Sequence, residues 1–149
     1  MEVKKVLIAV DNSLCSEQAA QKGYEIASMF DADVALINIV VPAPAAVSAD
    51  FPIGPILIEN YDQASDNSKF LMEEIANKFA RGKETTFLSV IDIASHGITE
   101  QAEAWGADLI VIGSHGRGGL FSLLVGSVSE SVSRKSTCPV LIIPYKEKS

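Results

Sequence analysis

Several residue types and patterns are scarce in this chain, and each absence narrows the range of functions. The 149 residues include two cysteines, Cys15 and Cys138, and two histidines, with no C-x-x-C pair. Zinc sites and redox pairs use closely spaced cysteines or histidines, so a zinc site is not expected. Both cysteines are interpreted as small packing residues, although Cys15 could lie near a helix N-terminus, where thiolates are favoured.

Basic runs and long apolar runs are also missing. The 12 basic and 19 acidic residues give a formal net charge of −7, which argues against a nucleic-acid or anionic-membrane partner. The apolar runs have the length of strands, far short of the roughly 20 residues that span a membrane. The charged residues before the first apolar run do not resemble a signal peptide. We therefore expect a cytoplasmic protein with one globular domain over residues 1–149.

Short apolar runs alternate with segments of helical period along the chain. Strands are expected at the apolar runs 6–10, 34–41, 87–91, 108–112 and Val140–Ile143. Between them, small and apolar side chains recur every three or four residues, which predicts helices around 19–30, 61–79 and 98–105, with a more polar helix at 128–136. This alternation is typical of βαβ units, which build an α/β fold with a parallel sheet and helices on both faces.

One connection does not fit this alternation. Residues 42–60 contain four prolines and no clear period, yet they carry many apolar side chains. Loops of this length inside compact domains are usually functional or disordered. The segment is interpreted either as a lid over a bound base or a subunit interface, or as a plain loop packed on its own domain.

The glycine-rich stretch 113–127, GSHGRGGLFSLLVGS, is the strongest functional signal in the sequence. It follows the fourth expected strand and precedes a helix, with the spacing G-x2-G-x9-G-S at Gly113, Gly116, Gly126 and Ser127. Unpaired N–H groups at a helix N-terminus, and the close backbone approach that glycine permits, suit phosphate oxygens. The spacing favours a phosphate or nucleotide site. In the structural alternative, Gly113 ends the strand, Gly116, Gly118 and Gly119 make turns, and Ser127 opens an S-x-x-E capping box.

Two common nucleotide motifs are missing. No G-x4-G-K-[ST] occurs, which excludes a P-loop, and no G-x-G-x-x-G follows the first strand, which excludes a dinucleotide fingerprint. Ligands of open parallel sheets bind beyond the carboxyl ends of the strands, where the strand order reverses. Asp11 follows the first expected strand and Gly113 the fourth. If those strands are neighbours, the two halves of a site meet.

The sequence resembles the universal stress protein family over essentially its whole length. GSHGRGGLFSLLVGSVSESVSRKSTCPVLIIP resembles the C-terminal ATP-binding signature of that family, and KKVLIAVDNS and ALINIV resemble its first two strands. The resemblance implies an open, twisted, five-stranded parallel sheet in the order 3-2-1-4-5, a Rossmann-like fold of the adenine nucleotide alpha hydrolase type. It also implies a homodimer formed through the strand Val140–Ile143.

The resemblance further implies roles for individual residues. Ala9 and Asp11, at the end of the first strand, and Ile39, in the second, would surround the adenine. The ribose and phosphates of ATP would be held, largely by main-chain N–H groups, at Gly113, His115, Gly116, Gly126, Ser127, Val128 and Ser129. The cofactor would be ATP, with or without Mg²⁺ or Mn²⁺, and the protein would be a nucleotide-responsive regulatory module of the stress response.

Some of these side chains have structural alternatives. Asp11 could accept from the adenine amino group, contact the ribose or a metal-bound water, or make an Asx-turn at a helix start. His115 could bond a phosphate or be an exposed loop residue, and Arg117 could screen the triphosphate or be a solvated surface side chain. His96 has no cysteine or second histidine at ligand spacing and is interpreted as structural.

The main alternative function is an enzyme, a slow ATP hydrolase or nucleotidyl transferase on the same fold. Such an enzyme needs a positioned base or nucleophile and groups that stabilise charge on the transferring phosphoryl group. The sequence has neither a P-loop lysine nor an obvious acidic pair for two metal ions, so a binding module is expected. An interaction protein with an empty site is a further alternative, against which the complete glycine spacing argues.

Overall fold

The computed structural model describes residues 1–41, 56–115 and 127–147, with the backbone alone for residues 56–60. Three residues of the expected phosphate site, Gly116, Arg117 and Gly126, lie outside the described residues. Most of the expected lid or interface segment lies outside them as well. The prediction that the connection continues to residue 60 is wrong: residues 56–60 belong to helix α2, which begins at Ile56. All four prolines of the segment precede this point, so none interrupts the helix from residue 56 onward.

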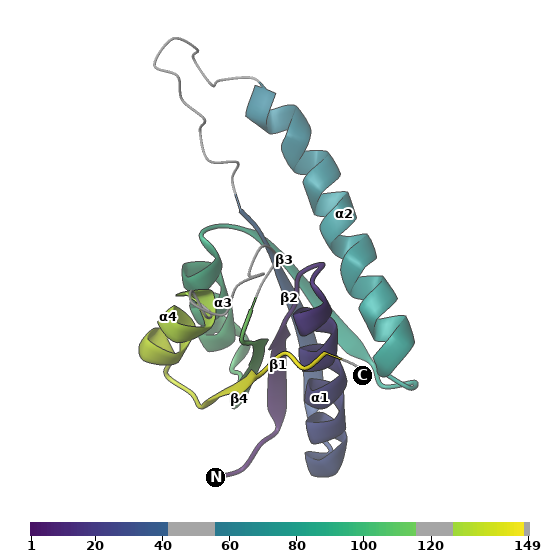
Figure 1. Cartoon of the computed structure of the whole chain (residues 1–149), viewed down its shortest axis with the longest axis vertical. Coiled ribbons are helices and arrows are strands. Elements are labelled where there is room, and N and C mark those ends of the chain that lie inside the picture. The colour runs from purple at the N-terminus through teal and green to yellow at the C-terminus, as the bar shows by residue number, and fades with distance from the viewer. Residues whose placement is uncertain (42–55, 116–126, 148–149) are drawn as a thin grey trace.

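The strands form one parallel sheet whose order reverses beside the first strand (Figure 1). The strands are β1 (Lys5–Ala9), β2 (Asp33–Val40), β3 (Thr85–Ile91), β4 (Leu109–Gly113) and β5 (Val140–Ile143). Their order in the sheet is β3-β2-β1-β4-β5, which confirms the predicted fold class and strand order. β1 pairs with β2 on one side, where Val6 lies opposite Val34, and with β4 on the other, where Val6 lies opposite Leu109. The switch point therefore falls between β1 and β4.

Helices cover both faces of the sheet (Figure 1). The helices are α1 (Leu14–Phe30), α2 (Ile56–Phe79), α3 (Ala94–Trp105) and α4 (Ser127–Lys135). α1 and α2 pack on one face, and α3 and α4 pack on the other. Successive side chains of β1 alternate between the two cores: Val6 and Ile8 belong to the first, Leu7 and Ala9 to the second. β1 is buried on both faces, as its uninterrupted apolar run predicts.

Local chemistry sets the start of α1 beside the switch point. The Ser13 side chain caps the helix by accepting from the Ser16 N–H at 3.1 Å. Asp31, at the other end, is left-handed with φ 52° and closes the helix through its own N–H. Within α1, Gly23 faces Ile8, and a Cβ on Gly23 would lie 2.5 Å from the Ile8 Cδ1. The glycine thus lets α1 lie close to β1.

Candidate functional site

A cleft of about 880 Å³ opens at the carboxyl ends of β1, β2 and β4. Its walls come from the segments that follow these strands and from α2, α3 and α4. The cleft includes the switch point between β1 and β4, where open parallel sheets bind their ligands. Its volume lies within the range of roughly 300–1,000 Å³ that is usual for small-molecule sites.

The structure gathers the described residues of the predicted site on this one cleft. The lining includes all eight of them: Ala9, Asp11, Ile39, Gly113, His115, Ser127, Val128 and Ser129. These residues come from distant parts of the chain, and the pairing of β1 with both β2 and β4 brings them together. Their individual roles toward a ligand stay predictions.

Asp11 takes part in the turn between β1 and α1 while also lining the cleft. Its Oδ1 accepts from the Ser13 N–H at 2.8 Å, which makes the expected Asx-turn. Its own N–H donates to the Ser16 Oγ at 2.7 Å. The structural interpretation of this aspartate is therefore correct, and it is compatible with a role in the cleft because the same residue lines the wall.

Gly113, the first glycine of the motif, has a packing reason to be glycine. It ends β4 beside the first turn of α1, and a Cβ there would lie 2.7 Å from the Cys15 Sγ and 3.2 Å from the Cys15 carbonyl oxygen. Cys15 is itself buried, as its interpretation as a packing residue expects. One part of the structural alternative for the glycine motif thus holds at Gly113, while the same residue lines the cleft.

A hydrogen-bonded group at the exit of β4 holds the side chain of His115. The Ser114 Oγ lies 2.8 Å from the His115 Nδ1, and it also accepts from the Tyr145 N–H at 3.3 Å. The His115 N–H donates to the Cys15 Sγ at 3.5 Å. His115 is half-buried and lines the cleft, so it is not a fully exposed loop residue.

Sequence reasoning missed the wall that α2 contributes. Ala64, Asn67, Ser68 and Leu71 of this helix line the cleft together with Asn38 of β2. No motif marks these residues, because only the packing of α2 against β2 and β3 brings them to the edge of the sheet. Asn38 carried one available signal: it is a polar residue near the carboxyl end of a buried strand, and its Nδ2 donates to the Val10 carbonyl oxygen at 2.8 Å.

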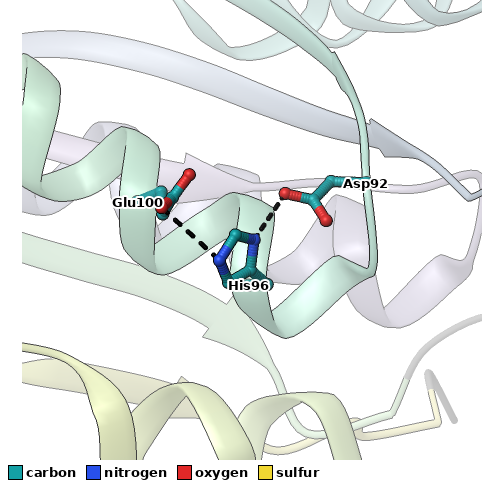
Figure 2. Close-up of side chains that lie close together, drawn as sticks. All are labelled: Asp92, His96 and Glu100. Atoms are coloured by element: carbon teal, nitrogen blue, oxygen red, sulfur yellow. Dashed lines mark hydrogen bonds and ion pairs between the residues drawn. The ribbon is translucent and has the colours of Figure 1, made fainter.

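A charged cluster formed by α3 and the turn before it is a second feature that sequence reasoning missed. Asp92, His96 and Glu100 follow one another at four-residue intervals, and their ligand-type atoms lie within 4.8 Å of one another. Figure 2 shows the imidazole between the two carboxylates, with Asp92 Oδ2 at 2.6 Å from Nδ1 and Glu100 Oε1 at 3.4 Å from Nε2. Among the described residues, no other group of three such side chains is this close.

The geometry of this cluster favours a protonated imidazole. The hydrogen bond to Asp92, and then the negative charges of Asp92 and Glu100, raise the pKa of His96, against a smaller opposing effect of Lys135. The hydrogen bond with His96, followed by the one from the Ile93 N–H, lowers the pKa of Asp92. Because both ring nitrogens face carboxylates, the cluster is an ion-pair group at the start of α3, in keeping with the structural interpretation of His96.

The fold and the cleft together define a class of protein: an open parallel α/β sheet with a ligand site at its switch point. The sequence matches the model of the universal stress protein family over residues 2–144. Universal stress protein MJ0531 of Methanocaldococcus jannaschii is 36% identical over 150 residues, which cover 97% of this chain and 84% of that protein. The chain belongs to the universal stress protein family.

Solved structures show the same architecture. Protein MJ0577 of Methanocaldococcus jannaschii superposes with a TM-score of 0.84 at 28% identity, covering 99% of this chain and 100% of its own. A universal stress protein in complex with cAMP superposes with a TM-score of 0.69 at 26% identity, covering 96% of this chain and 98% of its own.

Among the described residues, none of the helices has the length and apolar character needed to cross a membrane.

Proposed function

We propose that the protein binds ATP in the cleft at the switch point and acts as a nucleotide-responsive regulatory module. The observation that carries the proposal is that the described residues of the predicted adenine and phosphate site all line one cleft of about 880 Å³. The related universal stress protein in complex with cAMP supports an adenine nucleotide as the ligand class. Action in the cytoplasm, as part of a stress response, belongs to the same proposal.

The two sides of the cleft suit the two ends of a nucleotide. Ala9 and Ile39 present apolar surface from β1 and β2, which fits the faces of a base. α4 also reaches the cleft: the helix begins at Ser127, and Ser127 and Val128 line the wall. The first N–H groups of a helix have no partner within the helix and favour an anion. Local backbone donors of this kind allow a chain with a net charge of −7 to bind a triphosphate.

The acid groups in the cleft favour binding over catalysis. Among the described residues that line it, Asp11 is the one carboxylate. Magnesium bound to nucleotides is commonly held by one or two carboxylates together with the phosphates, so Asp11 fits a Mg²⁺ or Mn²⁺ ion that accompanies ATP. A hydrolase also needs a positioned base for the attacking water. With a single carboxylate in this wall, we propose binding with negligible turnover.

A homodimer through β5 is also part of the proposal. Among the described strands, β5 pairs only with β4, so it forms one edge of this sheet. Leu141 and Ile142 of this short strand are 36% and 38% exposed. An apolar edge with unpaired N–H and C=O groups invites pairing with another chain. Pairing of the same strand in two copies across a two-fold axis gives a closed dimer.

Binding is tested directly with purified protein. Mass spectrometry of small molecules released from fresh protein is expected to show an adenine nucleotide, and calorimetry is expected to show tighter binding of ATP than of GTP. The variant His96→Gln, which changes a side chain outside the cleft lining, is the control and should bind ATP as the wild type does. A folded wild-type protein that binds neither ATP nor another adenine nucleotide would overturn the proposal.

Substitution of Asp11 distinguishes a binding module from an enzyme. Asp11→Asn keeps an oxygen that can accept from the Ser13 N–H, whereas Asp11→Ala removes the Asx-turn as well. If the carboxylate contacts ATP, Asp11→Asn should weaken binding by about 1 kcal/mol, the usual size of one hydrogen bond, with turnover negligible in both proteins. Hydrolysis on the order of 1 per second in the wild type, lost in a variant that still binds ATP, would favour the enzyme instead.

A further inference from the structure

Ser114 is a buried polar side chain between the cleft and the end of the chain. It is 6% exposed, follows the last residue of β4, and has its own N–H bonded to the Ile143 carbonyl oxygen of β5 at 2.9 Å. In the described part of the chain, its Oγ contacts the His115 Nδ1 at 2.8 Å, the Tyr145 N–H at 3.3 Å and the Cys15 Sγ at 3.9 Å. The hydroxyl is thus placed among one close ring nitrogen, one backbone donor and one distant sulfur.

The proton on Ser114 can be placed by counting donors and acceptors. A hydroxyl has one hydrogen to donate and two lone pairs to accept with. The Tyr145 N–H can only donate, so it occupies one lone pair. The Cys15 S–H donates to the Ile143 carbonyl oxygen at 3.8 Å. Two atoms could then accept the hydroxyl hydrogen. The His115 Nδ1 lies 2.8 Å away and is the better acceptor, because the Cys15 Sγ lies 3.9 Å away and sulfur is a weak acceptor.

We infer that Ser114 is a positioning residue that fixes the tautomer of His115. With the hydroxyl hydrogen on Nδ1, a neutral imidazole carries its own hydrogen on Nε2. Among the described residues, no partner is found for this Nε2, and His115 lines the cleft. His115 thereby offers an N–H donor to an anion in the cleft. This inference rests on the proposed function for the identity of that anion, a phosphate group of ATP.

The contact between Ser114 and Tyr145 gives this arrangement its rigidity. The Tyr145 N–H belongs to the segment that follows β5, and the neighbouring Lys146 exchanges two backbone hydrogen bonds with the Gln18 side chain, at 2.7 Å and 3.1 Å. The hydroxyl of Ser114 therefore contacts a segment that follows β5 and is itself bonded to α1 through Gln18. A donor that is fixed before the ligand arrives loses less conformational entropy on binding.

The tautomer is measured by nitrogen NMR of protein labelled at histidine. The chain has two histidines, so His96→Gln leaves His115 as the one labelled imidazole. At about pH 8.5, where an imidazole is ordinarily neutral, His115 is expected to carry its hydrogen on Nε2. Ser114→Ala, made in the same background, should lose this preference and give a mixture. A wild-type His115 with its hydrogen on Nδ1 would overturn the inference even if Ser114→Ala failed to fold.

The consequence for binding is measured with ATP and adenosine, which differ in their phosphates. Ser114→Ala should weaken ATP binding about threefold to tenfold, the equivalent of one hydrogen bond, and leave adenosine binding unchanged. Equal weakening of both ligands would show that Ser114 only maintains the fold, and the inference would be wrong. A wild-type protein that binds no nucleotide would instead overturn the proposed function, while the spectrum would still decide the tautomer.

Discussion

The close approach of β4 to α1 at Gly113 leads to a quantitative prediction for Gly113→Ala. The added Cβ would lie 2.7 Å from the Cys15 Sγ, 3.2 Å from the Cys15 carbonyl oxygen and 3.3 Å from its carbonyl carbon. Optimal separations between carbon atoms are roughly 3.5–4.0 Å. Two of the three obstructing atoms belong to the backbone of α1, so rotation of the Cys15 side chain can relieve only part of the clash.

The expected loss follows from two opposing effects. Overpacking of a buried site typically costs about 1–3 kcal/mol, and the backbone atoms place this case in the upper half of that range. Replacing glycine also restricts the unfolded chain, which stabilises by about 0.4–1 kcal/mol. We expect Gly113→Ala to lower the free energy of unfolding by about 1–2.5 kcal/mol. For a chain of this size, that is a fall in Tm of roughly 2–10 °C.

Urea unfolding followed by circular dichroism measures this loss, and a double-mutant cycle assigns its cause. In a Cys15→Ala background, Gly113→Ala should cost less than in the wild type, because the nearest obstructing atom, Sγ, is gone. Gly82→Ala is the matched control: Gly82 has φ +83° and no neighbour within 4 Å, so its cost is independent of Cys15. Equal costs of Gly113→Ala in both backgrounds, or no cost in either, would refute the packing argument.

Two further predictions concern the surface of the molecule. Asp92→Asn should lower Tm most at pH values between 3.8 and 6.5, the ordinary pKa values of aspartate and histidine. Because the pKa of His96 is raised, this residue stabilises the fold fully at pH values below its ordinary pKa, and the contribution is lost as the pH rises through the raised pKa. Because the pKa of Asp92 is lowered, this residue stabilises the fold at pH values above its ordinary pKa. Equal effects at about pH 5.5 and pH 9 would contradict this ion pair. Leu141→Lys on the β5 edge should give a folded monomer in light scattering, whereas Met29→Lys, at a side chain that is 80% exposed, should not change the mass. A wild-type protein that is monomeric at micromolar concentration would contradict the dimer.

The sequence by itself predicted the class of fold and the chemistry of one loop. Uninterrupted apolar runs such as residues 6–10 require burial on both faces, and helical periods between them require a cover on each face, so a parallel sheet was predictable. The resemblance supplied the strand order, which the structure confirms. Glycine spacing pointed to the loop after the fourth strand because a phosphate site needs backbone donors on a strand–helix junction.

The tertiary structure decided which of these parts meet. The period of a segment specifies its buried face but not its neighbour. The pairing of β1 with β4, and the cleft that Asp11 and His115 both line, therefore depend on the order in which the strands assemble. The α2 wall of the cleft and the approach of Gly113 to Cys15 are likewise set by packing between segments far apart in the chain. Ser114 is the sharpest case. In the sequence it is one serine between a glycine and a histidine, and only the folded chain brings the Tyr145 N–H to the hydroxyl that also contacts the histidine ring.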